Sequence, residues 1–216
     1  MTYFETELQS LKERLLVMAS RAEASVAHAM EALVQRDDDA ARKVREEDDA
    51  IDQLEKEIDE QAIRLLSKAP LATQLRLIVT TLKIARDLER VGDEATTIAR
   101  RSIELSQEPQ LKPYVDLPRM AALARGMLND ALEAFVTRDP SRAREVIPRD
   151  REVDALNKQL YRELASFMIE KPSNITRCLN LMTISKALER IADHAKNVAE
   201  DVVYLYEGRD IRHGGT

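Results

Sequence analysis

A glutamate and an aspartate four residues apart form a short pattern that occurs twice in this chain of 216 residues. The first copy, LERVGD, spans residues 88–93, and the second, LERIAD, spans residues 188–193. Side chains four residues apart share one face of a helix, so the two carboxylates of each copy point the same way. Such like-charged pairs destabilise an isolated helix by about 0.2–0.5 kcal/mol, and their repetition predicts a cation between them. The residues concerned are Glu89 and Asp93 in the first copy and Glu189 and Asp193 in the second.

Two further acidic pairs with the same spacing precede these motifs, one in each half of the chain. Asp48 and Asp52 form the first pair, and Asp150 and Asp154 form the second. If the helices that carry them lie beside the motif helices, four carboxylates converge in each half. Oxygen ligands in that number suit iron, manganese or magnesium, with zinc as an alternative.

A simpler interpretation is that the acidic residues form ordinary ion pairs on a helix surface. A basic residue lies three positions before each acidic residue of both motifs. Pairs of this kind stabilise a helix by only about a few tenths of a kcal/mol. This interpretation explains any single pair well, whereas same-sign pairs in register in both halves favour a shared ligand. The basic residues are Arg86 and Arg90 in the first half and Lys186 and Arg190 in the second.

Apolar residues at intervals of three and four predict long amphipathic helices in the first half of the chain. The first helix runs from a capping box at Thr2 and Glu5 to a point just before Asp37, which caps the second helix. The second helix ends near Pro70, because the residue before a proline is pushed out of the helical region. The third helix carries the first motif and ends before a stretch at 106–118 that contains three prolines.

The same three-helix pattern then starts again. A shift of 102 residues takes Asp37 to Asp139, and a shift of 100 residues takes Glu89 to Glu189. We therefore expect an all-α fold of six long helices, arranged as two tandem pseudo-symmetric three-helix bundles that pack side by side. Pro148 predicts a kink or a break in the fifth helix. The expected divisions are residues 1–107 for the first repeat, 108–117 for a proline-containing linker, 118–206 for the second repeat and 207–216 for a flexible tail.

The composition agrees with a helical protein and argues against several other classes of protein. Hydrophobic residues make up 44% of the chain and charged residues 33%, with only 5 Gly and 7 Pro, a balance typical of long helices. The formal net charge of −6 argues against nucleic-acid binding, which usually requires a basic surface. The single Cys178 excludes an intrachain disulfide, and neither a signal-peptide pattern nor an apolar run of about 18 residues is present. A cytoplasmic location is therefore expected.

The duplicated three-helix unit, the stretches LERVGDEATTIA and LERIADHAKNVA, and the tail GRDIRHGG together resemble the PhoU family. The resemblance covers essentially the whole chain. It implies a cytoplasmic negative regulator of phosphate uptake and phosphate-starvation signalling that has no catalytic activity. The implied partners are the ATPase subunit of the phosphate ABC transporter and a phosphate-sensing histidine kinase, which would hold the protein at the inner membrane without insertion. The resemblance also implies a homodimer.

The resemblance further implies that the acidic motifs bind metal, either as a divalent ion or as a multinuclear cluster. Iron is the first candidate, with zinc, manganese, magnesium and nickel as alternatives. Carried onto this sequence, the ligands are Glu89, Asp93, Glu189 and Asp193, supported by Asp48, Asp52, Asp150 and Asp154.

Two other functions stay open at this point. One is a metal-dependent phosphoesterase or oxidase that uses the carboxylates, and the other is a purely structural helical interaction module. The enzyme is disfavoured because the sequence has no Glu-x-x-His motif and no arrangement of a nucleophile with a general base. Metal analysis of the purified protein separates the structural module from the other two.

Overall fold

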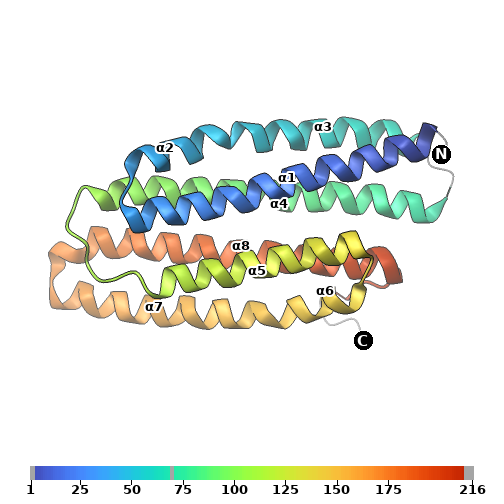
Figure 1. The fold of residues 1–216 in the computed structure, drawn as a ribbon. Coiled ribbons are helices and arrows are strands. Elements are labelled where there is room, and N and C mark those ends of the chain that lie inside the picture. The colour runs from blue at the N-terminus through green and yellow to red at the C-terminus, as the bar shows by residue number, and fades with distance from the viewer. Residues whose placement is uncertain (1–2, 69–70, 212–216) are drawn as a thin grey trace.

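The computed structural model describes residues 3–68 and 71–211, and within these ranges it contains helices and no strand. Figure 1 shows two helical units lying side by side, which confirms the all-α prediction and its two repeats. The first unit consists of α1 (Tyr3–Gln35), α2 (Asp38–Glu47), α3 (Asp49–Leu66) and α4 (Ala72–Ser106). The second consists of α5 (Asp116–Thr137), α6 (Pro140–Val146), η1 (Ile147–Arg149), α7 (Asp150–Glu170), η2 (Pro172–Asn174) and α8 (Ile175–Glu207).

The long helices α4 and α8 form most of the contact between the two units and run antiparallel (Figure 1). Ion pairs fix their register: Lys83 Nζ lies 3.0 Å from Asp201 Oδ1, and Arg190 lies 3.1 Å from Glu94 Oε1. These pairs place the residues near 91 opposite those near 191. Both acidic motifs therefore lie halfway along the molecule, close to the axis that relates the two repeats.

Aliphatic side chains at helical spacing build the core, as the sequence predicts. Val91 and Ile191 are completely buried, and so are most residues of the same helix faces. Burial of this kind contributes about 25 cal/mol for each Å² of apolar surface removed from water. The carboxylates of the two motifs therefore belong to α4 and α8, the helices with the most buried residues.

The second helix of each unit is interrupted. In the second unit the interruption is the 3₁₀ turn Ile147–Arg149, which confirms the break predicted at Pro148. In the first unit the prediction of one continuous helix is wrong, because α2 ends at Glu47 and α3 begins at Asp49 without a proline. The break falls within four consecutive acidic residues, at an aspartate, which has low helix propensity and favours a helix start.

The second helix of each repeat begins with an aspartate N-cap. Asp37 accepts hydrogen bonds from the backbone N–H groups of Asp39 and Ala40, which confirms its predicted role as a cap. Asp139 caps α6 in the same way. Thr2 of the predicted capping box, the predicted helix end at Ala69–Pro70 and the last part of the predicted tail, 212–216, lie outside the described residues.

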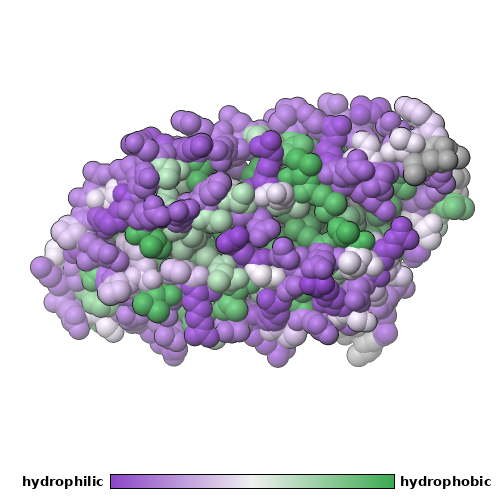
Figure 2. Space-filling view, viewed as in Figure 1, coloured by the Kyte–Doolittle hydropathy of each residue, from purple (hydrophilic) through white to green (hydrophobic). Residues whose placement is uncertain are grey.

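One face of the molecule carries an apolar strip. In Figure 2, apolar side chains gather in the middle of the face that α1 and α5 form, among charged and polar neighbours. A groove there is lined mainly by small and apolar residues, including Ala27, Met30, Val34, Pro118 and Ala121. Exposed strips of this kind are typical of protein contact sites. In the described part of the chain, no helix combines the length and the apolar character needed to cross a membrane.

Candidate functional site

The first acidic cluster lies between the start of α3 and the middle of α4. Glu89 is partly buried, and its burial together with Asp93, Glu55 and Asp52 raises the pKa of its carboxyl group. Across the same helix pair, burial raises the pKa of Asp48, and the nearby Asp52 and Asp93 add to the rise. We define this first acidic cluster as Asp48, Asp52, Glu55, Glu89 and Asp93.

A glycine in the motif makes room for this cluster. Gly92 faces Asp48, and a Cβ atom added to Gly92 would lie 2.7 Å from Asp48 Oδ1 and 3.1 Å from Ile51 Cδ1. The missing side chain therefore lets the carboxylate of Asp48 approach the backbone of α4. The second motif has Ala192 at this position, so the two sites are not identical in shape.

The second acidic cluster lies at the equivalent place between α7 and α8. Burial raises the pKa of Asp193, and Asp150 and Glu189 add to the rise. Two ammonium groups also reach this cluster: Lys196 Nζ lies 3.2 Å from Asp150 Oδ2, and Lys186 Nζ lies 2.5 Å from Glu189 Oε2. We define this second acidic cluster as Asp150, Asp154, Glu189 and Asp193.

The donor chemistry of both clusters suits a cation. The same two positions in each half present a buried carboxylate oxygen, and the oxygen of each glutamate lies within ion-pair distance of Arg90 or Lys186. Carboxylate oxygens are the ligands of hard cations such as magnesium, manganese and iron. Across residues 3–68 and 71–211, however, no three His, Cys, Asp or Glu side chains are arranged as metal ligands. The oxygens concerned are Asp48 Oδ1 and Glu89 Oε2 in the first cluster and Asp150 Oδ1 and Glu189 Oε2 in the second.

Some of the ion pairs considered from the sequence do form. Arg90 lies 3.3 Å from Glu89 Oε2 and 3.0 Å from Asp93 Oδ2. Its side chain is half exposed, so each contact contributes about 0–1 kcal/mol. Arg190, in contrast, crosses to Glu94 of α4 rather than to Asp193. Surface pairing therefore accounts for part of the first motif and leaves Asp193 to other neighbours.

Three residues in or beside these clusters were not singled out from the sequence. Glu55 adds a carboxylate to the first cluster, Lys196 adds an ammonium group to the second, and Thr96 lies beside Asp48. A position-by-position comparison of the repeats would have found them. It sets Glu55 against Asn157 and Thr96 against Lys196.

Replacing Asp48 by asparagine is expected to stabilise the metal-free protein at pH 7. The pKa of Asp48 is raised in the folded state above its usual value of 3.8, so ionised Asp48 lowers the stability of the fold. In the wild type this cost disappears as the pH falls through the raised pKa, and it should be absent from Asp48→Asn at every pH. Urea unfolding in the presence of a chelator, from about pH 4 to about pH 8, measures the difference in the free energy of unfolding between the two proteins.

The matched control is Asp130→Asn, for which the opposite sign is expected. Hydrogen bonds from Arg149 and then Arg142 lower the pKa of Asp130, so its ionised form stabilises the fold above the usual pKa of an aspartate. This stability is lost in the wild type only as the pH falls through the lowered pKa. Equal effects of the two substitutions at pH 7 would contradict the assigned environment of Asp48.

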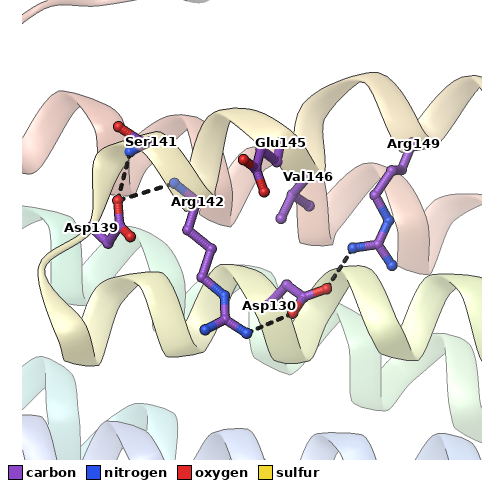
Figure 3. Close-up of a pocket in the computed structure, with 7 residues that line it drawn as sticks. All are labelled: Asp130, Asp139, Ser141, Arg142, Glu145, Val146 and Arg149. Atoms are coloured by element: carbon purple, nitrogen blue, oxygen red, sulfur yellow. Dashed lines mark hydrogen bonds and ion pairs between the residues drawn. The ribbon is translucent and has the colours of Figure 1, made fainter.

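A separate cavity of about 420 Å³ lies between α5 and α6 (Figure 3). Its arginines are already paired, because Arg142 and Arg149 both donate to Asp130, at 2.9 Å and 2.5 Å, and Arg142 also lies 2.6 Å from Glu133 Oε2. In the equivalent groove of the first repeat, His28 stands in place of Asp130 and lies 3.9 Å from Glu47, which stands in place of Arg149. Neither groove offers a free cationic group, so we place the candidate site at the acidic clusters.

The comparisons with known proteins agree over nearly the whole chain. A family model described as the PhoU domain matches residues 15–102 and again residues 117–202. A protein of Pseudomonas putida named "Phosphate-specific transport system accessory protein PhoU homolog" is 42% identical over 98% of this chain and 84% of its own length. A protein of Aquifex aeolicus with the same name is also 42% identical, over 96% of this chain and 94% of its own length.

Two solved structures show the same fold. The crystal structure of PhoU from Pseudomonas aeruginosa superposes with a TM-score of 0.92 at 41% identity, and covers 95% of this chain and 100% of that one. The phosphate transport system regulatory protein PhoU from Streptococcus pneumoniae gives a TM-score of 0.90 at 30% identity, over 96% of this chain and 99% of that one. The two matches to the family model span both repeats, including residues 88–93 and 188–193, which carry the acidic motifs.

Proposed function

The chain belongs to the PhoU family, and from this membership we propose that it is a cytoplasmic negative regulator of phosphate uptake and of phosphate-starvation signalling. The observation that carries the proposal is similarity along the full length to proteins named for phosphate-specific transport. A role in the regulation of phosphate transport follows from that similarity, and the chain is not an enzyme, since the family consists of accessory and regulatory proteins.

As partners we propose the ATPase subunit of the phosphate ABC transporter and a phosphate-sensing histidine kinase, which this protein would bridge. The names of the relatives support the first partner, because they describe an accessory protein of a transport system. The apolar strip along α1 and α5 supports protein contact in general, including a homodimer (Figure 2). Association with the transporter would bring the protein to the inner membrane.

We also propose that the protein binds a divalent or multinuclear metal, iron first, at its acidic motifs. Glu89 and Asp93 with Asp48 and Asp52 would hold it in the first repeat. A bound cation would neutralise carboxylates that otherwise repel one another. The equivalent set in the second repeat is Glu189, Asp193, Asp150 and Asp154.

Deletion of the gene is expected to leave phosphate-starvation genes expressed when phosphate is plentiful, because a negative regulator has been removed. A reporter for such a gene, read at high and low phosphate, measures the effect. Complementation with the wild-type chain should restore repression and serves as the control. Normal repression at high phosphate in a clean deletion strain would contradict the proposed regulatory role.

A further inference from the structure

We propose that the transporter partner binds as a homodimer on the face of α4 and α8 that points away from α1 and α5, with one of its subunits on each repeat. This inference rests on the partner proposed above and deepens it, because it states the symmetry and the surface chemistry that the partner must have. In Figure 1 this face lies on the far side, since α1 and α5 lie in front of α4 and α8. It is therefore separate from the apolar strip along α1 and α5.

Each repeat exposes a pair of apolar residues near the start of its last helix. Leu75 and Val79 of α4 are each 39% exposed, and they form the first apolar pair. Their equivalents at a shift of 100 residues, Ile175 and Leu179 of α8, are 43% and 53% exposed and form the second. The residue types differ between the repeats at both positions, yet all four side chains are apolar. Residues four apart share one face of a helix, so each pair makes one small apolar patch.

The two apolar pairs lie on the uncovered side of their helices. The helix α4 packs on α1, α2, α3 and α8, and α8 packs on the equivalent helices α5, α6, α7 and α4. The helices α1 and α5 cover one side of the layer that α4 and α8 form (Figure 1). The exposed pairs therefore lie on the opposite side of that layer.

A pseudo-two-fold axis relates the two apolar pairs. The ion pairs that join α4 to α8 set the residues near 91 opposite their repeat equivalents near 191. The helices α1 and α5 also meet at equivalent residues, because Arg125 Nη2 lies 3.4 Å from Glu23 Oε1, across the repeat shift of 102. The axis thus runs from the α1–α5 side to the α4–α8 side. Both pairs lie on one face, about 40 Å apart at a rise of about 1.5 Å per residue.

A basic residue follows each apolar pair on the same helix stripe. Arg86 and Lys186 occupy equivalent positions, two turns after Val79 and Leu179. Arg86 is exposed and, within residues 3–68 and 71–211, forms no ion pair, whereas Lys186 pairs with Glu189. Charge complementarity therefore calls for a partner segment with apolar side chains followed by an acidic one, presented twice.

One symmetric partner fits this arrangement better than two separate molecules do. A homodimer presents the same surface twice about a two-fold axis. Once its first subunit is bound, the second meets the other apolar pair without a further loss of translational freedom, which strengthens the complex. Loss of a single apolar pair should therefore weaken the binding of the whole partner.

The purified ATPase subunit of the phosphate transporter, mixed with the full chain, is the probe that tests the inference. Analytical ultracentrifugation is expected to show two ATPase subunits for each copy of this chain. Val79→Glu or Leu179→Glu alone should weaken binding at least about tenfold, and the two substitutions together should abolish it. All of these variants should unfold in urea at the wild-type midpoint, because the substituted side chains are exposed.

The matched control is the double variant Val34→Glu with Val136→Glu. These two valines are also repeat equivalents and are half exposed, but they lie on α1 and α5. The control should bind the ATPase subunit as wild type does.

Three outcomes would overturn the inference. A one-to-one complex, or binding that survives Val79→Glu with Leu179→Glu, would overturn it while leaving the transporter as the partner. Loss of binding in the control variant alone would instead favour the apolar strip along α1 and α5. A wild-type chain that binds no ATPase subunit would overturn the proposed partner together with this inference.

Discussion

Replacing Leu88 by alanine is expected to lower the free energy of unfolding by about 2–5 kcal/mol. Leu88 is 0% exposed and lies in α4, the helix that packs on α1, α3 and α8. Truncation removes a buried isobutyl group and leaves a cavity that the surrounding rods can fill only in part. Because α4 belongs to both the first bundle and the contact between bundles, little relaxation is available to it.

Urea unfolding followed by circular dichroism measures this cost, with Leu179→Ala as the control. Leu179 is 53% exposed in α8, so its truncation should change stability by no more than about 0.5 kcal/mol. Leu188 is the equivalent of Leu88 in the second repeat and is also 0% exposed. Its truncation to alanine should lower the free energy of unfolding by about the same amount. If truncation of both leucines lowered the free energy of unfolding by less than about 1 kcal/mol, this would contradict their burial in the core.

The helices could be predicted from the sequence because their physical cause is local. Aliphatic residues at intervals of three and four define a buried stripe, and Asp37, Asp139 and Pro148 mark helix starts and a break through backbone chemistry. The break at Asp48 escaped prediction because no proline marks it. Aspartate disfavours a helix interior only weakly, by less than about 1 kcal/mol, so the surrounding fold decides whether the helix continues.

The site could be predicted only in part, because its neighbours come from tertiary structure. Helical spacing put Glu89 and Asp93 on one face, but it could not show that Arg190 would cross to Glu94 of the other repeat. The contact of Lys196 with Asp150 could be predicted in part. Its contact with Asp150 is tertiary, yet its contrast with Thr96 is visible once the repeats are aligned.

A metal ion should stabilise the folded protein by about 2.7 kcal/mol when its free concentration is 100 times the dissociation constant. Replacing Glu89 and Asp93 together by alanine should abolish this gain at the first cluster. The double substitution should not destabilise the metal-free protein, because it removes carboxylates whose burial and mutual repulsion raise the pKa of Glu89. A control pair, Glu13→Ala with Glu31→Ala, removes the same charge from exposed positions of α1 and should keep the full gain.

Thermal melts of the three proteins, in chelator and with added Mn²⁺, Mg²⁺, Zn²⁺, Ni²⁺ or anaerobic Fe²⁺, distinguish the metal site from simple ion pairing. If Glu89 and Asp93 served only as partners of Arg90, metal would shift no midpoint and the double substitution would cost about a few tenths of a kcal/mol. If they are ligands, the wild-type midpoint rises with metal and that of the double variant stays fixed or rises far less. A wild-type midpoint that moves with none of the five ions would rule out the metal site, because any ligand that binds only the folded state must raise it.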